Sequence, residues 1–491
     1  MSQRIVKNYV NGRWISPKHN GTLPVTNPST GEILADTPIS TKEEVQRAIE
    51  SANQAFPLWS RTPAPNRVEP LFKLAALLKE NEEKITRVLV AEMGKSLPDA
   101  RAEIKRTVQN VEVACGIPNL QMGEKLLNSA PNVDGEVLRL PIGVFAMIAP
   151  FNFPAMVPFW FLPYAIATGN TFILKPSERV PLTMEIITQY IDQIGLPPGV
   201  FNVVNGDRTV SETLLDSPQI QGISFVGSSN VAKIVAKKCV ETGKRFQALG
   251  SAKNHLVVMP DAKMDHVIRN MITSCYGCAG QRCMASSVIV CVGDVTYQSV
   301  IEKYVSATQT AIVADPLDPK VANEPIVIGP VISAEAKERI EQMIEEGINE
   351  GAKLVIDGRG YEVAGSENGN FVGPTVFIDV KPGMKIHSDE IFGPVVVIMK
   401  VDSLDEAITI INQHQYGNGA SIYTQDGFAA RKFKLETKAG MIGINIGIPA
   451  PVAYLPFGGM RGSIFSDIKA QGKSIIRFYT EEKIITERFW D

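Results

Sequence analysis

Short apolar segments that alternate with helical segments in the middle of the chain constrain its fold more than any other feature. Phe145–Ala149, Thr171–Leu174 and Phe201–Val204 are apolar runs with the length of buried strands. Helices are expected between them, at Ala155–Thr168 and Pro181–Ile194. Such alternation builds βαβ units around a parallel sheet, whose ligand crevices lie at the carboxyl ends of the strands. The pattern therefore predicts an α/β fold with a place for a nucleotide.

The alternation continues through Gln221–Val226 and Val231–Thr242, and a second block of the same kind follows. The expected strands and helices of that block are Leu256–Met259, Asp265–Cys275, Val288–Cys291, Tyr297–Ile312, Ala334–Glu350, Lys353–Ile356 and Leu404–Asn412. Because single hydrophobic cores stop growing at about 250–300 residues, a chain of 491 residues is expected to divide. We predict two doubly wound parallel-sheet domains.

The N-terminal part is expected to be mainly helical after a strand-and-turn segment at Tyr9–Ile15. Ser40 and Glu43 have the spacing of a capping box, which predicts a helix from there to about Ala55. Two further helices are expected, at Asn66–Met93 and Leu97–Cys115.

Two other segments predict a small β-rich part outside the cores. Glu124–Leu140 alternates loosely around Asp134-Gly135, a dipeptide typical of hairpin turns. The tail, Ile475–Asp491, contains aromatic and β-branched runs such as Phe478-Tyr479-Thr480, which favour strands.

The composition, with 44% hydrophobic and 21% charged residues and a net charge of −3, gives no indication of a nucleic-acid or acidic-membrane partner. Leu140–Leu174 contains no charged residue, but Pro150, Pro154, Pro158 and Pro163 divide it into short pieces, so a buried core is expected there rather than a membrane span. Six cysteines in so long a chain are no disulfide framework, which indicates a reducing, cytoplasmic location.

The segment Gly277–Ser287 carries the candidate nucleophile, Cys283. Its glycines and small residues leave room for a ligand atom beside the thiol and the neighbouring backbone N–H groups. A thiol reacts as the thiolate, and Arg282 supplies a positive charge next to it. The alternative is a small buried residue without chemistry. Cys275 and Cys278 suggest a metal or redox site, but no fourth ligand with zinc spacing is near, so no metal is predicted.

Six motifs follow one another along the chain: Pro150-Phe151-Asn152-Phe153-Pro154, Gly169-Asn170-Thr171 with Leu174-Lys175-Pro176-Ser177-Glu178, Phe225-Val226-Gly227-Ser228, Gly280-Gln281-Arg282-Cys283, Glu390-Ile391-Phe392-Gly393-Pro394 and Pro456-Phe457-Gly458-Gly459. In this order and spacing they resemble the NAD(P)-dependent aldehyde dehydrogenases. The resemblance implies an aldehyde dehydrogenase-like fold with an NAD-binding domain (1–120 and 141–252), a catalytic domain (253–453) and a β-rich oligomerisation arm (121–140 and 454–491). In this family the arm pairs strands across subunits, so a homotetramer or homodimer is expected.

A narrower resemblance, to the CoA-acylating methylmalonate-semialdehyde dehydrogenases, comes from Phe151–Met156, Lys175–Pro181, Ala252–His255 with Met259–Ala262, and Gln281–Ala285. It implies NAD-dependent oxidation of methylmalonate or malonate semialdehyde and transfer of the acyl group to coenzyme A. The implied products are propionyl-CoA or acetyl-CoA together with CO₂. NAD is the expected cofactor, and CoA and a small semialdehyde are the expected small-molecule partners.

The same resemblance implies roles for individual residues. Cys283 would attack the aldehyde carbon, and the Asn152 amide with the Cys283 backbone N–H would stabilise the oxyanion of the thiohemiacetal. A carboxylate at Glu178 would accept hydrogen bonds from ribose hydroxyls and repel a 2′-phosphate, which favours NAD over NADP. Arg106 and Arg282 would clamp the substrate carboxylate, because guanidinium groups bind carboxylates bidentately. The residues implied for NAD binding are Ala149, Phe151, Lys175, Glu178, Arg179, Ser228, Glu390 and Phe392.

Each of these residues also has an alternative without chemistry. Asn152 could cap a turn between two prolines, Lys175 and Glu178 could be a surface ion pair, and Ser228 could be an ordinary helix cap. Arg106 could lie on a solvated helix face.

One position departs from the hydrolytic members of the family, in which a glutamate two residues before a Gly-Gly-Lys activates water. Here Leu249 stands at that position, and Ser251 replaces one of the glycines. An aliphatic side chain cannot take a proton, so attack by water loses general-base help worth roughly 10²–10⁴-fold, whereas a CoA thiol is itself a strong nucleophile.

Two other functions stay open from the sequence. A hydrolytic aldehyde dehydrogenase of wider substrate range would release a free acid and accept uncharged aldehydes. A non-catalytic or redox-sensing protein on the same fold would keep its activity when Cys283 is replaced with serine.

Overall fold

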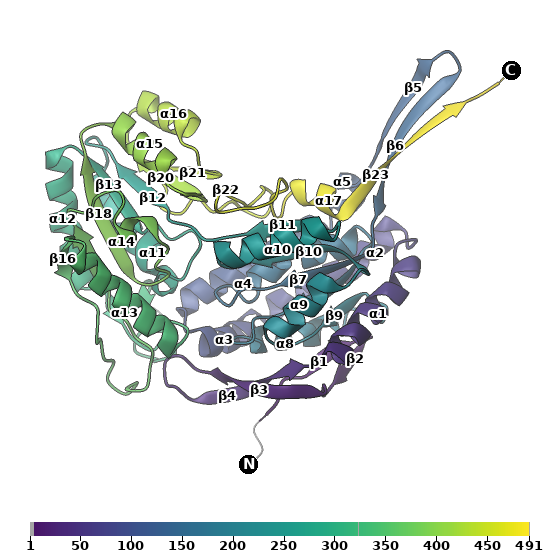
Figure 1. The fold of residues 1–491 in the computed structure, drawn as a ribbon, viewed down its shortest axis with the longest axis horizontal. Coiled ribbons are helices and arrows are strands. Elements are labelled where there is room, and N and C mark those ends of the chain that lie inside the picture. The colour runs from purple at the N-terminus through teal and green to yellow at the C-terminus, as the bar shows by residue number, and fades with distance from the viewer. Residues whose placement is uncertain (1–3, 323, 491) are drawn as a thin grey trace.

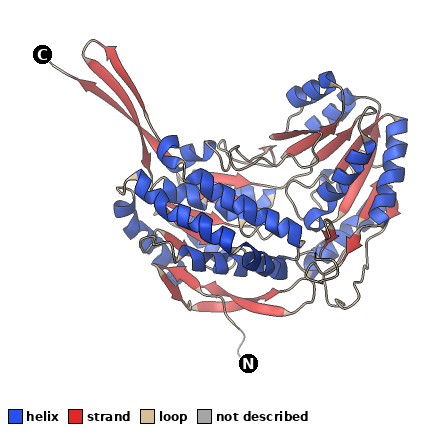
Figure 2. Ribbon diagram, turned by 180° about the vertical axis from the view of Figure 1, so that it is seen from behind, coloured by secondary structure: helices blue, strands red, loops and turns tan. Residues whose placement is uncertain are grey.

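The computed structural model describes residues 4–322 and 324–490 and contains two seven-stranded sheets, each with helices packed against it (Figure 1; Figure 2). The described part leaves out residues 1–3, 323 and 491. No helix in the described ranges is both long and apolar enough to cross a membrane.

The first sheet has the strand order β11-β10-β7-β8-β9-β1-β2. The five strands from β11 to β9 are parallel, and β1 and β2 add an antiparallel hairpin at one edge. Asn11 and Gly12, both with positive φ (54° and 69°), form the turn of that hairpin. The strand bounds are β1 (Asn8–Val10), β2 (Arg13–Ile15), β7 (Val144–Ile148), β8 (Thr171–Lys175), β9 (Phe201–Val203), β10 (Ile220–Val226) and β11 (Arg245–Leu249).

Helices cover both faces of this sheet because successive strand residues point to opposite sides. Phe145 and Met147 of β7 belong to one apolar core, and Val144, Ala146 and Ile148 belong to another. The first core contains residues of α2 (Ala64–Glu80), α3 (Glu82–Met93), α4 (Leu97–Ala114), α5 (Ile117–Leu120), α6 (Met156–Phe159), α7 (Leu162–Ala167) and α8 (Leu182–Ile191). The second contains residues of α1 (Lys42–Trp59), α9 (Arg208–Asp216) and α10 (Ser229–Glu241).

The second sheet has the order β16-β17-β18-β13-β12-β20-β21, parallel except for β16. Its strands are β12 (His255–Val258), β13 (Val288–Val292), β16 (Lys353–Ile356), β17 (Thr375–Ile378), β18 (Val395–Val401), β20 (Gly419–Tyr423) and β21 (Met441–Ile444). Its helices are α11 (Met264–Tyr276), a 3₁₀ turn η1 (Gly277–Gly280), α12 (Asp294–Gln309), α13 (Ala334–Asn349), α14 (Lys385–Ser388), α15 (Leu404–Gln413) and α16 (Gly427–Glu436). Two parallel-sheet units are thus present, as the alternating pattern predicted.

A three-stranded arm projects away from the body, with the C-terminal strand lying along a hairpin from the first half of the chain (Figure 1). Its strands are β5 (Glu124–Ala130), β6 (Val133–Pro141) and β23 (Thr480–Arg488), and α17 (Ser474–Tyr479) precedes β23. Two-stranded pairs are formed by β3 (His19–Thr26) with β4 (Ile33–Ser40), β14 (Ile312–Val313) with β15 (Val327–Ile328), and β19 (Tyr416–Gly417) with β22 (Met460–Arg461).

Several local predictions were wrong in detail. The N-cap of α1 is Thr41, whose hydroxyl accepts from the Glu44 N–H, so the capping box predicted at Ser40 is displaced by one residue. The helix predicted over Asn66–Met93 is broken at Asn81, where φ is −107°.

The remaining differences have equally local causes. The helix predicted over Ala155–Thr168 is the two short helices α6 and α7, which fits the presence of Pro158 and Pro163. The hairpin turns at 131–132 rather than at Asp134-Gly135, which lies inside β6. Phe478 and Tyr479, predicted as strand, end α17.

Candidate active site

A cleft of about 950 Å³ opens where the carboxyl ends of the first sheet face the second unit. Segments that follow β7, β8, β10 and β11 line it from one side, and the loop with Cys283 and residues 389–392 line it from the other. This is the edge at which parallel sheets bind ligands. Of the residues predicted to act, the cleft is lined by Ala149, Phe151, Asn152, Lys175, Glu178, Ser228, Cys283, Glu390 and Phe392.

Cys283 lies half-buried beside a constrained backbone turn. Cys278, Ala279 and Gly280 all have positive φ (58°, 51° and 71°), which is costly for the two residues with side chains. A Cβ at Gly280 would lie 2.1 Å from the Gly393 carbonyl oxygen, so only glycine fits there. The turn thus holds the chain close to the Gly393 backbone and directs the next residues toward the cleft.

Two amide side chains fix the backbone of Cys283 itself. Asn254 Nδ2 and Asn418 Nδ2 each donate to the Cys283 carbonyl oxygen at 2.9 Å. A fixed carbonyl orients the peptide group, which holds the backbone beside the thiol in one geometry. Site prediction from the sequence missed Asn254 and Asn418, because neither lies near Cys283 in the chain.

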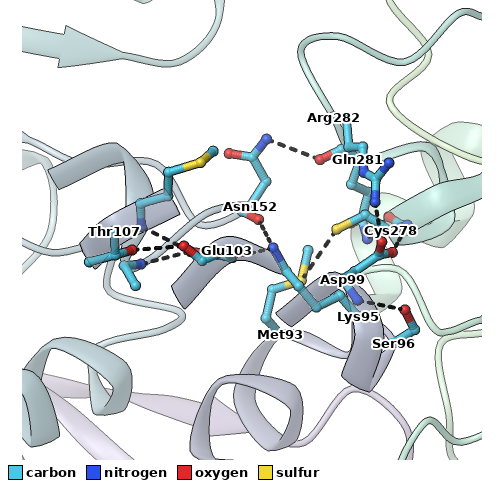
Figure 3. A network of polar contacts seen from close by, with 12 residues as sticks. Met93, Lys95, Ser96, Asp99, Glu103, Thr107, Asn152, Cys278, Gln281 and Arg282 are labelled. Carbon is cyan, nitrogen blue, oxygen red and sulfur yellow. Dashed lines mark hydrogen bonds and ion pairs between the residues drawn. The ribbon is translucent and has the colours of Figure 1, made fainter. Parts of the chain in front are cut away.

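Asn152 is buried and follows β7 at the floor of the cleft. The Asn152 side-chain Nδ2 donates to the Gln281 carbonyl oxygen at 3.0 Å. The backbone carbonyl oxygen of Asn152 accepts from Lys95 Nζ at 2.6 Å (Figure 3). An amide nitrogen carries two hydrogens, so one remains for a ligand atom in the cleft. The alternative of a simple turn cap does not account for this contact with the Cys283 loop.

The Lys175 ammonium lies at the end of β8, where it donates to Glu178 Oε2 at 3.0 Å and to the Pro176 carbonyl oxygen at 3.0 Å. Burial favours the neutral form of Glu178, but the Lys175 charge and hydrogen bond outweigh it and lower the pKa of that carboxyl. The carboxylate is therefore ionised at neutral pH in the cleft wall. Arg179 instead approaches Glu335 at 3.6 Å and does not line the cleft.

Ser228 caps α10, since its hydroxyl accepts from the Val231 N–H at 3.5 Å, and it also lines the cleft. Asn230 and Val231, at the start of this helix, line the same cleft, and a helix start suits an anionic group. Phe151, which follows β7 on the same wall, and Phe392 on the opposite wall meet edge to face with ring centroids 5.8 Å apart. The cleft therefore offers polar groups along one wall and an aromatic pair near Cys283.

Glu390 is the carboxylate whose charge acts most on Cys283. Its Oε1 accepts from the Ala252 N–H at 2.8 Å, and burial raises the pKa of this carboxyl despite the Ser251 hydroxyl, the Ala252 N–H and the Lys253 charge. Ser251 also exchanges hydrogen bonds with Ser229 at the start of α10, at 2.9 and 3.2 Å. The serine in place of the family glycine thus ties the end of β11 to α10 and to Glu390.

Leu249 ends β11 and is 4% exposed. It belongs to the apolar cluster against which Cys283 packs, and its carbonyl oxygen accepts from the Gly227 N–H. Among the cleft-lining residues the carboxylates are Glu178, Glu212, Asp389 and Glu390. At the end of β11 itself, the structure places an aliphatic side chain and no base.

Comparison with known proteins shows the family of the chain. The model of the aldehyde dehydrogenase family matches residues 14–485. The chain belongs to the aldehyde dehydrogenase family. A malonate-semialdehyde dehydrogenase from Geobacillus kaustophilus (strain HTA426) is 44% identical over 99% of this chain and 98% of its own length. One from Pseudomonas aeruginosa PAO1 is 45% identical over 98% of this chain and 95% of its own length.

Solved structures give the same family and fold. A methylmalonate-semialdehyde dehydrogenase from Oceanimonas doudoroffii is 40% identical and covers 99% of both chains with a TM-score of 0.96. A protein from Sinorhizobium meliloti 1021, named provisionally as a methylmalonate-semialdehyde dehydrogenase and solved with NAD, is 39% identical, with a TM-score of 0.97 over 100% of this chain and 99% of its own. The aldehyde dehydrogenase fold predicted from the six motifs is confirmed.

The two arginines predicted to clamp the substrate lie outside the cleft lining of this family member. Arg282 pairs with Asp99 at 2.5 Å, and Asp99 also accepts from the Cys278 N–H at 3.1 Å (Figure 3). Arg106 donates to Gln109 on its own helix, α4, at 3.0 Å. The cleft is instead lined by two arginines that site prediction missed. Arg208 pairs with Glu212, and Arg339 of α13 donates to the Met343 sulfur at 3.5 Å.

The cysteines near Cys283 have other environments. Cys275 donates to the Ser286 carbonyl oxygen at 2.8 Å, and Cys278 Sγ lies 3.9 Å from the Met93 sulfur. All six cysteines are free thiols. Within residues 4–322 and 324–490, no group of three or more His, Cys, Asp or Glu side chains has the geometry of a metal site.

Burial raises the pKa of the Cys283 thiol to about 12; the Glu390 charge adds to this, and Arg282 and two backbone N–H groups offset only part of it. Below its pKa the thiolate fraction of a thiol grows tenfold with each pH unit. We therefore expect the rate of Cys283 alkylation by iodoacetamide, without NAD, to keep rising between pH 7 and 10. The measurement is mass spectrometry of the Cys283 peptide against time. A rate that levels off near pH 8.5, as for a free cysteine, would contradict the raised pKa of this thiol.

Proposed function

We propose that this chain catalyses the NAD-dependent, CoA-acylating oxidation of methylmalonate or malonate semialdehyde to propionyl-CoA or acetyl-CoA and CO₂. The observation that carries the proposal is a nucleophile, Cys283, that lies in a cleft with an amide donor, Asn152, while Leu249 stands at the position of the family's water-activating base, in the apolar cluster against which Cys283 packs. The names of the relatives, malonate- and methylmalonate-semialdehyde dehydrogenases, support the same substrate class.

The residues of the cleft fit NAD. Ionised Glu178 would accept hydrogen bonds from the adenosine ribose, Lys175 beside it would donate to the same sugar, and the start of α10 at Ser228 would hold the pyrophosphate. Glu390, Phe392 and Phe151 would contact the nicotinamide ribose and ring. Ala149 would contact the adenosine half of NAD. Arg179 lies outside the cleft lining, 3.6 Å from Glu335, and would act on NAD through its positive charge alone.

The reaction begins at the Cys283 sulfur. The Cys283 thiol releases its proton to solvent, and the thiolate adds to the aldehyde carbon. The negative charge that develops on the oxygen would be stabilised by the second Asn152 side-chain N–H and the Cys283 backbone N–H. NAD, when bound, would supply the hydride acceptor, so that transfer of hydride from the thiohemiacetal carbon would give NADH and leave a thioester on Cys283. The CoA thiolate then attacks this thioester and releases Cys283.

The substrate carboxylate is assigned to Arg106 and Arg282. Because Arg282 already pairs with Asp99, a substrate carboxylate would have to share or displace that partner. The substrate carboxylate is bonded to the carbon next to the thioester carbonyl. Such a β-carboxyl thioester can lose CO₂.

Omitting CoA tests the proposal directly. With methylmalonate semialdehyde and NAD, we expect one NADH per active site without CoA, followed by turnover at least about tenfold slower than with CoA, because water lacks general-base help. The measurement is NADH absorbance in a stopped-flow instrument, with product identification by mass spectrometry. Full multiple turnover without CoA, and a free acid as product, would favour a hydrolytic aldehyde dehydrogenase.

The domain division, assembly and compartment follow as further parts of the proposal. The first sheet with its helices fits the NAD-binding domain (1–120 and 141–252), the second fits the catalytic domain (253–453), and β5, β6 and β23 fit an oligomerisation arm. The arm exposes Leu126, Leu127 and Ile484, which supports a homotetramer or homodimer, and light scattering tests this. Six free cysteines support a reducing, cytoplasmic location.

A further inference from the structure

A fully buried ion pair lies behind Asn152, outside the cleft. Lys95 and Glu103 have side chains that are 0% exposed, with Lys95 Nζ 2.6 Å from Glu103 Oε2. Removing two charges from water costs several kcal/mol per ion, so a pair in this position is weak evidence for stability. What distinguishes it is the set of groups that it holds.

The Lys95 ammonium uses all three of its donor directions. It donates to Glu103 and to the Asn152 carbonyl oxygen, each at 2.6 Å, and it lies 3.9 Å from the centroid of the Phe153 ring (Figure 3). Glu103 Oε1 accepts from the Ala155 and Met156 N–H groups at 2.9 and 3.1 Å. The pair thus binds the backbone on both sides of Phe153.

This segment has no strand or regular helix of its own from 149 to 155. Its geometry therefore depends on contacts such as these. The result is that the Asn152 amide reaches the Gln281 carbonyl oxygen, two residues before Cys283, at 3.0 Å.

The Cys283 loop is tied to the same helix. Asp99, one turn before Glu103 on α4, accepts from the Cys278 N–H and from Arg282. Residues four apart on a helix share a face, so one face of α4 holds both segments that supply oxyanion donors (Figure 3).

We propose that the Lys95–Glu103 ion pair is a positioning device that sets the Asn152 amide relative to Cys283 and so governs the stabilisation of negative charge on the substrate oxygen. The inference rests on the role given to Asn152 in the proposed function. Lys95 and Glu103 touch no substrate; they act through Asn152.

A double-mutant cycle tests this with an ester rather than the semialdehyde. The Cys283 thiolate adds to the carbonyl carbon of p-nitrophenyl acetate, the same kind of oxyanion forms, and p-nitrophenolate leaves, without NAD or CoA. The neutral pair Lys95→Met with Glu103→Gln is similar in volume, and such replacements of buried ion pairs are often tolerated. It is combined with Asn152→Ala, and Cys283→Ser is the blank.

We expect the neutral pair to lower the burst rate about tenfold or more when Asn152 is present and less than about twofold when Asn152 is alanine, because coupled residues are not additive. NAD affinity, measured by fluorescence titration, should stay within about twofold. Equal losses in both backgrounds, or no loss with Asn152 present, would overturn the proposal.

The matched control is Glu92→Gln. Glu92 is also fully buried and also accepts from two backbone N–H groups, of Leu182 and Thr183 at 2.7 and 2.8 Å, but these belong to the start of α8 and not to the Asn152 segment. Its burst rate should equal that of the unmodified chain. If the neutral pair does not fold, Glu103→Gln alone, which keeps an acceptor for Ala155 and Met156, enters the same cycle. The ester burst needs neither CoA nor semialdehyde. The proposed function can therefore fail while this inference holds, and this inference can fail while the proposed function holds.

Discussion

Replacing Cys283 with serine is expected to lower NADH formation from the semialdehyde by at least about 10³-fold, because the covalent route through a thiohemiacetal is lost. A serine hydroxyl in the same half-buried position is a far weaker nucleophile, because it holds its proton much more tightly than a thiol does. NAD binding should persist, since Lys175, Glu178 and the start of α10, which fit the adenosine and pyrophosphate part of NAD, lie on the other wall of the cleft. The measurement is steady-state NADH absorbance together with a fluorescence titration of NAD.

Cys275→Ser provides the matched control. Cys275 is a fully buried thiol on α11, and a serine hydroxyl can keep its hydrogen bond to the Ser286 carbonyl oxygen. We expect this variant to keep activity within about threefold, as for a substitution away from the site. Mass spectrometry after brief incubation with aldehyde and NAD should find the acyl group on Cys283 alone. Activity that survives Cys283→Ser would favour a binding or redox-sensing function instead.

The sequence predicted those site residues that follow directly after a predicted strand. Asn152, Lys175 and Ser228 each come just after an apolar run, and the carboxyl ends of parallel strands meet at one edge, so their convergence could be expected. The same logic explains the two-sheet fold. Alternating side chains on β7 enter two different cores, and a run apolar on both faces implies helices on both faces.

What could not be predicted depends on residues far apart in the chain. Asp99 neutralises Arg282 across a separation of 183 residues, so the charge beside Cys283 is much less available than adjacency in sequence implied. The raised pKa of the thiol follows from burial, which no local pattern shows. The break at Asn81 and the displaced cap at Thr41 have a local cause instead. The end of a helix shifts by a residue or two, according to which side chain can hydrogen-bond a free backbone group.

Introducing a base at Leu249 is expected to produce the second large effect. In Leu249→Glu, turnover without CoA should rise by roughly 10²-fold over the unmodified chain, because a carboxylate at the end of β11 can deprotonate a water that attacks the thioester. The side chain at this position lies in the apolar cluster against which Cys283 packs, so its reach is appropriate. Burial should raise the pKa of the new carboxyl, and turnover should therefore increase with pH through that raised value.

Leu249→Gln distinguishes the effect of a proton acceptor from the effect of a polar side chain. Glutamine has the same length and hydrogen-bonding reach as glutamate but accepts no proton. Both variants place a polar group at a position that is 4% exposed, so both should lower the melting temperature, while only Leu249→Glu gains CoA-independent turnover. The readout is NADH formation without CoA, with the free acid measured in the same samples. Equal gains in both variants would show that access of water to the thioester, rather than a missing proton acceptor, limits hydrolysis in this chain. The control of acyl transfer would then lie in the packing of the cluster around Leu249 and not in its lack of a base.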